Sequence, residues 1–490
     1  MASTSKDYTS EKLEIPNEGD AALAEFGNLD DHENPKKWPM LRKWKAMLGI
    51  SSFVLMSPLS STIVGPSLPS IARDLSITRP AEQALVLSIF VLPYAFGPLI
   101  ASPLSEIYGR VPVIQSWNLL YLVFNTACGA ARSKSAMFAF RFLAGFFGSA
   151  TLGIGGGTLS DLFTAEERGK AVAIYSVIPL LSPVFGPILG GLISQHISWH
   201  WAFYTSSLLD AVIQFLGLYL LEETYAPVLL RKKQMRSIRL TTPNQQLRST
   251  TKDALKELPT RLKANLGRAV LLLTTQPIVQ VFAVYNAFLY GIIYILYTTF
   301  PDLYTNVYHQ TEGMVGLHYI AMGVGMVIAA EGFTLVNDRI FALLKAKNNG
   351  VALPEFRVPF MAPATLLIAG GLFWYGWSAQ HKLQWIMPDI GSGIFCAGAV
   401  ICGISANAYM IDTYGKFSAS ALAAVGTLRS LTAFGFPLFA PYVFEIIGYG
   451  WTGSLLGFCA LGMGLPGVAL IWVYGKVLRR RSTLAAPDIG

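Results

Sequence analysis

Charged residues are scarce in this chain, and their scarcity excludes a soluble multidomain protein. Only 13% of its 490 residues are Asp, Glu, Lys or Arg, whereas 53% are hydrophobic. A soluble domain has about 25% charged residues. So few charges cannot hydrate the surface of a 53.3 kDa chain whose mean hydropathy is +0.46. We therefore expect lipid to be the solvent for most of the chain.

Cysteine and the motifs of cofactor chemistry are also sparse. Four cysteines lie in separate apolar stretches without CxxC spacing, namely Cys128, Cys396, Cys402 and Cys459. We interpret them as small buried hydrophobic residues, not as disulfide partners or metal ligands. His196 and His200 have the spacing of a helical metal pair, but no other ligand set accompanies them. Because a phosphate-binding loop is missing as well, the sequence predicts no metal, no cofactor, no ATP-driven pump and no enzyme.

Apolar stretches long enough to cross a bilayer are abundant. A spanning helix needs about 20 mainly apolar residues. Twelve such stretches can be counted, at residues 45–66, 83–103, 112–131, 136–158, 170–193, 200–221, 276–300, 314–336, 358–379, 386–410, 418–444 and 450–474. They fall into two sets of six. The sequence therefore predicts an all-α integral membrane protein with twelve transmembrane helices in two pseudo-symmetric six-helix bundles.

Polar segments define the expected domains. These are a tail over 1–44, a bundle over 45–221, a central loop over 222–275, a bundle over 276–474 and a tail over 475–490. We expect the central loop to be a solvated linker, with a regulatory site as the alternative. Its last part, Leu266 to Thr275, could form an amphipathic helix on the membrane surface.

Lysine and arginine are distributed unevenly between the two sides of the expected membrane. If the N-terminus lies inside, the inside segments hold 30 of these residues and the outside loops hold 5. The positive-inside rule then places both termini in the cytoplasm. The net charge of +8 is thereby explained as a topological signal, so nucleic acid is not needed as a partner.

The turn between the second and third stretches combines an acid and a base. It reads Ser102-Pro-Leu-Ser-Glu106-Ile-Tyr-Gly109-Arg110, which places a carboxylate and a guanidinium beside helix ends. Such a pair can lock two helices in one state and release them in another, although a static anchor would look the same. Asp161, at the end of the fourth stretch, and Arg168 are expected to belong to the same gating region.

Charges inside the apolar stretches are costly, which makes them functional candidates. Arg141 lies near the start of the fourth stretch, where it either has a functional partner or reaches back to the interface. Asp210 lies near the middle of the sixth stretch and Glu331 in the inner third of the eighth. A carboxylate at low dielectric favours its protonated form, which suits a proton carrier. An ion pair with Arg141 or Arg429, or a hydrogen-bonded neutral acid, is the alternative.

Polar and aromatic side chains of the later stretches are candidates for contact with a substrate. Tyr290, Tyr294 and Tyr297 share one helical face, which more often packs against another helix than lines a cavity. The residues that could line a cavity are Asn286, Tyr290, Tyr294, Asn407 and Arg429.

The fifth stretch is unusually rich in proline and glycine. It contains Pro179, Pro183 and the run Gly186-Pro187-Ile-Leu-Gly190-Gly191. Proline removes a backbone donor and glycine lets helices touch, so this helix is expected to be bent and closely packed.

These motifs, in this order, resemble those of the major facilitator superfamily, and within it the fungal branch of twelve-helix drug:proton antiporters. The turn that ends at Arg110 is similar to the superfamily motif G-x-L-a-D-r-x-G-r-k, with Glu106 in the place of Asp. Arg141 resembles the arginine of the fourth-helix motif, and Gly186 to Gly191 resemble the fifth-helix signature of antiporters. Further similarity lies in Trp199-His200-Trp201-Ala-Phe203, Pro354-Glu355-Phe-Arg357, Asp412-Thr-Tyr414 and Phe436-Pro437-Leu-Phe439.

The resemblance implies a plasma-membrane carrier that exchanges entering protons for a leaving drug, toxin or secondary metabolite by alternating access. It implies that Arg141 tunes a proton site, that Asp210 or Glu331 carries the proton, and that the fifth-helix residues Gly186, Pro187, Gly190 and Gly191 supply the bend and the packing. The implied partners are a small organic substrate, protons and the lipid bilayer, and the implied state is a monomer.

Two other functions stay open at this point. One is an organic-acid or polyamine carrier of the same fold, and the other is a transporter-like sensor that signals through its tails. Intramembrane arginines favour an anionic substrate and intramembrane acids favour a cationic one. The sequence holds both, so charge alone does not decide the substrate.

Overall fold

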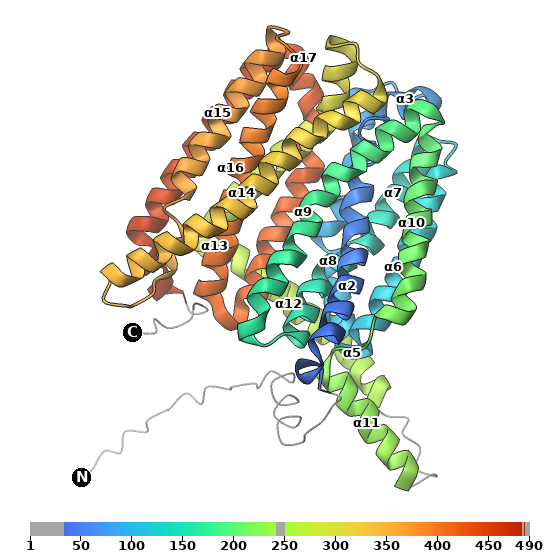
Figure 1. Cartoon of the computed structure of the whole chain (residues 1–490), viewed down its shortest axis with the longest axis vertical. Coiled ribbons are helices and arrows are strands. Elements are labelled where there is room, and N and C mark those ends of the chain that lie inside the picture. The colour runs from blue at the N-terminus through green and yellow to red at the C-terminus, as the bar shows by residue number, and fades with distance from the viewer. Residues whose placement is uncertain (1–33, 242–249, 483–484, 486–490) are drawn as a thin grey trace, which may run out of the picture.

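The computed structural model describes residues 34–241, 250–482 and 485, and these residues form helices, turns and loops without a strand (Figure 1). The N-terminal half contains η1 (Pro35–Lys37), α2 (Met40–Thr62), α3 (Leu68–Asp74), α4 (Pro80–Ser88), η2 (Leu92–Ala95), α5 (Gly97–Tyr108), α6 (Arg110–Gly129), α7 (Lys134–Gly148), α8 (Ala150–Leu162), α9 (Ala165–His196) and α10 (Trp199–Leu220). The connecting segment holds α11 (Ala226–Thr241) and α12 (Thr250–Thr275). The C-terminal half contains α13 (Pro277–Asp302), η3 (Leu303–Val307), α14 (Glu312–Lys347), η4 (Pro354–Arg357), α15 (Met361–Gln380), α16 (Ile386–Tyr414), η5 (Gly415–Phe417) and α17 (Ser418–Arg481).

The helices confirm the predicted all-helical membrane fold. Within the described residues, 8 helical segments are long and apolar enough to cross a membrane. The second expected stretch is divided among α4, η2 and α5, where Pro93 and Pro98 interrupt regular helix. Conversely, α17 contains the last two expected stretches, because its backbone leaves helical geometry only at Gly448, with φ 77° and ψ 171°.

The side chains of these helices are arranged for lipid and not for water. On α10, Leu208 and Phe215 are exposed at 69% and 58%, whereas Ser206 and Asp210 are buried. The helix thus presents its apolar side chains outward and its polar ones to neighbouring helices. This orientation is stable only where hydrocarbon covers the outer surface.

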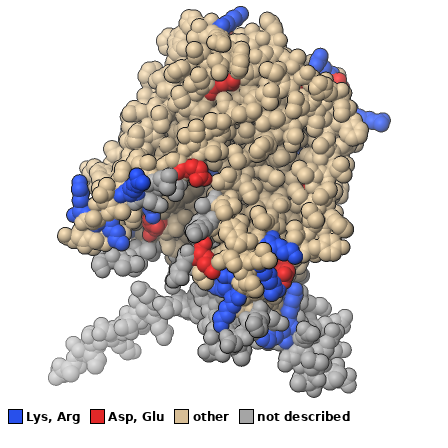
Figure 2. Space-filling model, viewed as in Figure 1, with Lys and Arg blue, Asp and Glu red and all other residues tan. Residues whose placement is uncertain are grey.

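Charged side chains gather at two ends of the molecule and leave a broad uncharged belt between them (Figure 2). One end, which we call the basic end, carries α5, α11 and the last turns of α17. The opposite end, which we call the α3 end, carries α3 and the loop that precedes α14. The belt between them is the part of the surface that suits contact with lipid.

The two halves are packed closely at the α3 end. Gly191 of α9 lies against the backbone carbonyl of Glu312 at the start of α14, and Gly316 lies against the carbonyl of Pro187. A methyl group on either glycine would collide with backbone. Towards the basic end, α9 and α14 separate (Figure 1). The described structure is therefore closed between α9 and α14 at the α3 end and splayed at the basic end.

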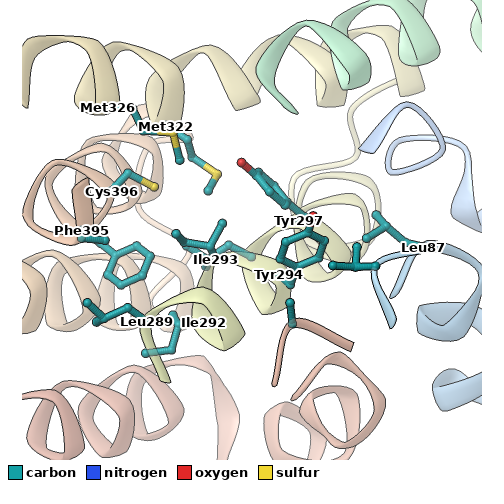
Figure 3. Close-up of a cluster of buried hydrophobic side chains, with 14 of the residues drawn as sticks. Leu87, Leu289, Ile292, Ile293, Tyr294, Tyr297, Met322, Met326, Phe395 and Cys396 are labelled. Carbon is teal, nitrogen blue, oxygen red and sulfur yellow. The ribbon is translucent and has the colours of Figure 1, made fainter. Parts of the chain in front are cut away.

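Helix α13 lies deepest in the molecule. Its most apolar 18 residues are 72% buried, against 50% or less for the seven other spans. Figure 3 shows Tyr294 and Tyr297 of α13 among apolar side chains that include Leu87 of α4, Met322 of α14 and Phe395 of α16. The tyrosine face of α13 is thus mainly a packing surface.

Candidate functional site

Arg141 is completely buried, and its guanidinium is bound by backbone carbonyls. Nη1 donates to the carbonyl of Ser60 at 2.8 Å, and Nη2 donates to that of Ser61 at 3.0 Å. Nε donates to the carbonyl of Val86 at 3.0 Å, and Nη2 also reaches that of Leu87 at 3.5 Å. With an exposure of 0%, this side chain does not reach back to the membrane interface.

The four carbonyls are available because two helices end beside Arg141. Helix α2 ends at Thr62 and α4 ends at Ser88, so the carbonyls of their last turns have no partner within the helix. Each helix end also carries the negative pole of the helix dipole. The guanidinium supplies both donors and positive charge to the two ends together. Gly145, one turn further along α7, allows the close approach of the backbone at Phe90.

Asp210 is buried between α10 and α6, where an amide binds it. Asn118 Nδ2 lies 3.1 Å from each carboxylate oxygen of Asp210 and 2.8 Å from Gln214 Oε1. One turn along α6, the hydroxyl of Tyr121 bonds to Ser60 Oγ, and the carbonyl of Ser60 binds Arg141. Asp210 and Arg141 thus belong to neighbouring polar groups inside one half, without a salt bridge between them among the described residues.

The remaining expected coupling and substrate residues are placed unevenly. Glu331 is exposed on α14 and Asn407 is exposed on α16. Asn286 is buried and donates to the carbonyl of Phe282 in its own helix at 3.1 Å. Tyr294 is 7% exposed within the apolar cluster. Two of these four residues are thus exposed and two are buried.

Arg429 and Tyr290 do come together. The guanidinium carbon of Arg429, on α17, lies 4.3 Å from the centre of the Tyr290 ring, on α13. Both side chains are half-buried. Two residues earlier on α17, Thr427 donates to the carbonyl of Ala95 in the N-terminal half at 3.0 Å. The pair therefore lies where the two halves meet, at a depth near the middle of α13 and of the first part of α17.

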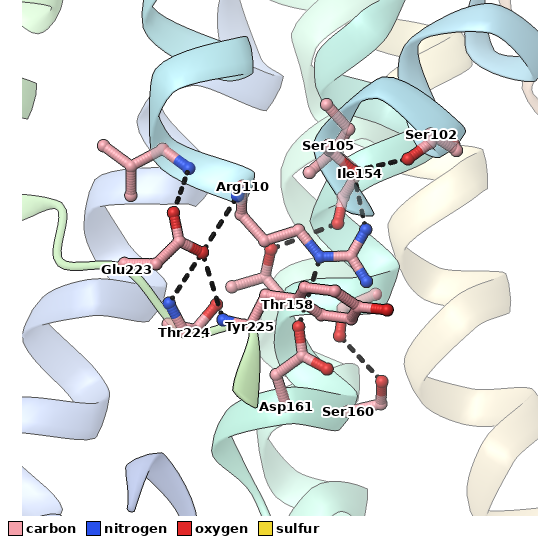
Figure 4. A network of polar contacts seen from close by, with 12 residues as sticks. Ser102, Ser105, Arg110, Ile154, Thr158, Ser160, Asp161, Glu223, Thr224 and Tyr225 are labelled. Atoms are coloured by element: carbon pink, nitrogen blue, oxygen red, sulfur yellow. Dashed lines mark hydrogen bonds and ion pairs between the residues drawn. The ribbon is translucent and has the colours of Figure 1, made fainter. Parts of the chain in front are cut away.

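At the basic end, Arg110 connects three helices (Figure 4). Its Nε donates to Asp161 of α8 at 3.2 Å, and its Nη1 donates to Ser105 of α5 at 2.7 Å. Its guanidinium also lies 4.7 Å from the ring centre of Tyr225. Glu106, the acid expected to face Arg110, is half-buried and takes no part in this network; Asp161 is the carboxylate partner.

Glu223 completes the same network, and sequence reasoning missed it. Its carboxylate accepts from the backbone amides of Arg110 at 2.9 Å and Val111 at 3.3 Å. These are the first residues of α6, where free amides and the helix dipole favour an anion. Gly109 precedes them with φ +103°, and a Cβ there would meet the Glu223 carboxylate. The acids that directly follow the sixth expected stretch are the sequence feature that could have pointed to Glu223. Arg168 belongs to α9, but its side chain lies outside the described residues.

The basic end also carries ion pairs that anchor α2 and α17. Lys43 Nζ lies 2.7 Å from Glu167 Oε2, and this hydrogen bond lowers the pKa of the Glu167 carboxyl. In the C-terminal half, Arg479 Nε and Nη2 donate to Glu355 at 2.9 and 3.1 Å. That buried pair joins the end of α17 to η4, and it was not predicted as a site.

The proline–glycine run of α9 makes the close contacts that such a composition favours. A Cβ on Gly186 would collide with the carbonyl of Leu59, and one on Gly190 would collide with that of Ile63. Gly191 faces α14, as described above. One helix is thus in backbone contact with α2 on one side and with α14 of the other half on the other side. Within the described residues no group of three His, Cys, Asp or Glu could hold a metal ion.

Known proteins resemble this chain along most of its length. The family model described as "Major Facilitator Superfamily" matches residues 50–437. The efflux pump vrtL of Penicillium aethiopicum is 43% identical over 95% of this chain and 92% of its own length. The efflux pump radE of Floropilus chiversii is 39% identical over 94% of this chain and 86% of its own length.

Solved structures share the fold at low sequence identity. The inward-open xylose transporter XylE from E. coli has a TM-score of 0.63 at 12% identity and covers 88% of this chain and 96% of its own. The human organic anion transporter MFSD10 has a TM-score of 0.58 at 18% identity and covers 89% of this chain and 100% of its own. Together with the family match and the two fungal relatives, the helical architecture leads to one conclusion: the chain is a multi-pass integral membrane protein of the major facilitator superfamily.

Proposed function

We propose that the chain is a proton-coupled antiporter that exports a small organic molecule, such as a secondary metabolite, across the plasma membrane. The observation that carries this proposal is Asp210, a buried carboxylate in a membrane helix that is bound by the Asn118 amide and not by a cation. Keeping such a group ionised is costly, and a bound proton relieves that cost. The export direction is supported by the names of the two fungal efflux pumps.

Transport follows by alternating access between the two bundles, 45–221 and 276–474, with segment 222–275 as their link. The close packing of α9 on α14 at the α3 end, and their separation at the basic end, support an arrangement open towards the basic end. We assign the basic end to the cytoplasm because lysine and arginine concentrate there. A monomer contains both bundles and is sufficient for this motion.

Arg429 and Tyr290 supply the contact to the substrate. Among the described ion pairs Arg429 has no carboxylate partner, and its half-buried guanidinium lies on an aromatic ring where the halves meet. Arg141, by contrast, is completely buried and bound by four backbone carbonyls. This difference favours an acidic or neutral substrate, such as an aromatic carboxylic acid or phenol, over a polyamine. An organic-acid carrier is therefore the second candidate function.

The test uses the purified chain in liposomes with an imposed pH gradient. A panel of radiolabelled aromatic acids, phenols, polyamines and lipophilic cations is followed together with a lumenal pH dye. We expect gradient-driven uptake of an acidic or neutral compound with opposite proton movement. Asp210→Asn is expected to uncouple the two fluxes, because an amide cannot carry a proton. Arg429→Gln is expected to reduce uptake of acids at least about tenfold while affecting neutral compounds less, as loss of a bond to a charged group implies.

Glu445→Gln, at an exposed acid of α17, is the matched control and should behave as wild type. Substrate flux that ignores the pH gradient in wild type would contradict proton coupling and leave a facilitator. Preferential uptake of polyamines would contradict the role given to Arg429.

A further inference from the structure

A second buried polar cluster lies in the C-terminal half near the α3 end. It consists of Tyr304 on η3, Gln310 in the following loop, His318 on α14 and Asp389 on α16. His318 Nδ1 lies 2.7 Å from Asp389 Oδ2, and the Tyr304 hydroxyl donates to Asp389 Oδ1 at 2.6 Å. His318 and Asp389 are 4% and 5% exposed. Three helical elements thus meet at one histidine–carboxylate pair.

Both nitrogens of His318 face oxygen atoms. Nδ1 faces the carboxylate, and Nε2 is bonded to Oε1 of Gln310. A neutral imidazole has one N–H donor, whereas an imidazolium has two. An imidazolium at this position would have an oxygen acceptor for each of its two N–H groups. If the proton leaves, rotation of the Gln310 amide offers an N–H to the same nitrogen, so neither state leaves a buried group without a partner.

The charge balance around the pair also favours a bound proton. Asp389 lies in the first turn of α16, where the helix dipole stabilises a carboxylate. The Tyr304 ring is stacked on His318 at 3.6 Å and nearly parallel. With the ring neutral, the site would hold one buried negative charge; with the ring protonated, its net charge is zero, which lowers the cost of burial.

Exposed basic groups lie in two neighbouring loops: His309 beside Gln310, and His381 and Lys382 in the loop whose Trp385 contacts His318. Other titratable groups lie closer to the pair. Near Asp389, the phenols of Tyr308 and Tyr375 are contributed by the loop after η3 and by α15. Asp302 lies at the end of α13, and Glu312 lies in the first turn of α14. None of these closer groups is a cation that could replace the proton. The Tyr308 hydroxyl is buried without a hydrogen-bond partner, so the cluster still has a polar atom available.

Helix α14 connects this cluster to the contact between the halves. Six residues before His318, the Glu312 carboxylate bonds to Ser70 Oγ of α3, and the Gly313 amide donates to Gln195 of α9 at 2.9 Å. The first turns of α14 therefore hold the α3 end closed, and the next turn is fixed to η3 and α16 through His318.

We propose that His318 and Asp389 form a second proton-binding site, in the C-terminal half, that is filled when the α3 end is closed. This inference rests on the proposed proton-coupled exchange and adds a site to it. The bound proton holds η3, α14 and α16 together and thereby steadies the turn of α14 that contacts α3 and α9. Protons reaching the α3 end favour its closure, because a ligand shifts a conformational equilibrium towards the state that binds it better.

The test measures exchange of substrate in liposomes at equal pH on both sides, from about pH 5 to pH 8, where imidazoles change charge. Equal pH makes the result independent of the direction of insertion. We expect the wild-type rate to depend on pH and the His318→Gln variant to lose that dependence at least in part. His381→Gln, at an exposed histidine of the neighbouring loop, should keep the wild-type profile. Thermal unfolding of each variant shows that it is folded.

A second variant keeps the proposal testable if His318→Gln does not fold. Tyr304→Phe removes a donor that shares the negative charge of Asp389 with the ring, so the carboxylate should attract the protonated ring more strongly and the profile should move to higher pH. An unchanged profile in both folded variants, or a shift to lower pH in Tyr304→Phe, would overturn the second site. A wild-type protein that moves substrate without protons would instead overturn the proposed function.

Discussion

Replacing Arg141 with lysine separates the shape of the guanidinium from its charge. Arg141 donates to carbonyls at the ends of two helices, and one of its four contacts, to Leu87 at 3.5 Å, is long. An ammonium concentrates its donors at one point, so it can serve the end of α2 or that of α4 but not both. Two buried carbonyls then lose their donor at about 1–3 kcal/mol each. Counting the long contact as weak, we expect the free energy of unfolding to fall by about 2–4 kcal/mol.

The assay is unfolding of the purified protein in mixed micelles, followed by tryptophan fluorescence as denaturing detergent is added. Arg132→Lys, at an exposed arginine in the loop before α7, is the control and should unfold as wild type does. If Arg141→Lys were as stable as wild type, simultaneous hydrogen bonding to the ends of α2 and α4 would not be needed for stability. Positive charge alone would then explain the residue, as it would for a side chain that merely reaches the interface.

Two further predictions concern the basic end. Gly109→Ala places a Cβ against the Glu223 carboxylate at a backbone φ of +103°, so we expect the free energy of unfolding to fall by about 1–3 kcal/mol. Gly462→Ala, where nothing lies within 4 Å of the added Cβ, is the control. Equal melting temperatures of the Gly109→Ala and Gly462→Ala variants would contradict backbone strain at Gly109. Lys43 lowers the pKa of Glu167 in the folded protein. Such a shift stabilises the fold at a pH above the pKa that the carboxyl has in the unfolded chain, and this stabilisation is lost as the pH falls through the pKa of the folded state. Acidification below about pH 4.3 should therefore destabilise wild type more than Glu167→Gln in melting experiments, and parallel curves would refute the linkage.

The sequence allowed Arg141 to be singled out, but not its partners. A charge inside an apolar stretch is visible in one dimension, and its cost follows from the transfer of a guanidinium out of water. The groups that bind Arg141 are four backbone carbonyls, those of Ser60, Ser61, Val86 and Leu87, and every residue has such a carbonyl. What distinguishes these four is that their helices, α2 and α4, end beside α7.

The position of a residue along a helix does not determine towards which side of the helix its side chain points. Glu331 and Asn407 lie within the expected stretches, yet both side chains are exposed, whereas Asp210 is buried. Neighbouring residues point about 100° apart around a helix axis, so the face that a helix turns to its neighbours decides between these outcomes. That rotation is set by packing with helices far away in the sequence.

The sequence by itself determined that the chain is an all-helical membrane protein. It could do so because transfer of about 20 apolar residues into lipid is a local property of each stretch. Only the tertiary structure decided which polar groups meet. Glu223 reaches the start of α6 from 113 positions away, and His318 reaches Asp389 from 71 positions away. Such pairs depend on the depth and rotation of separate helices, which no single stretch encodes.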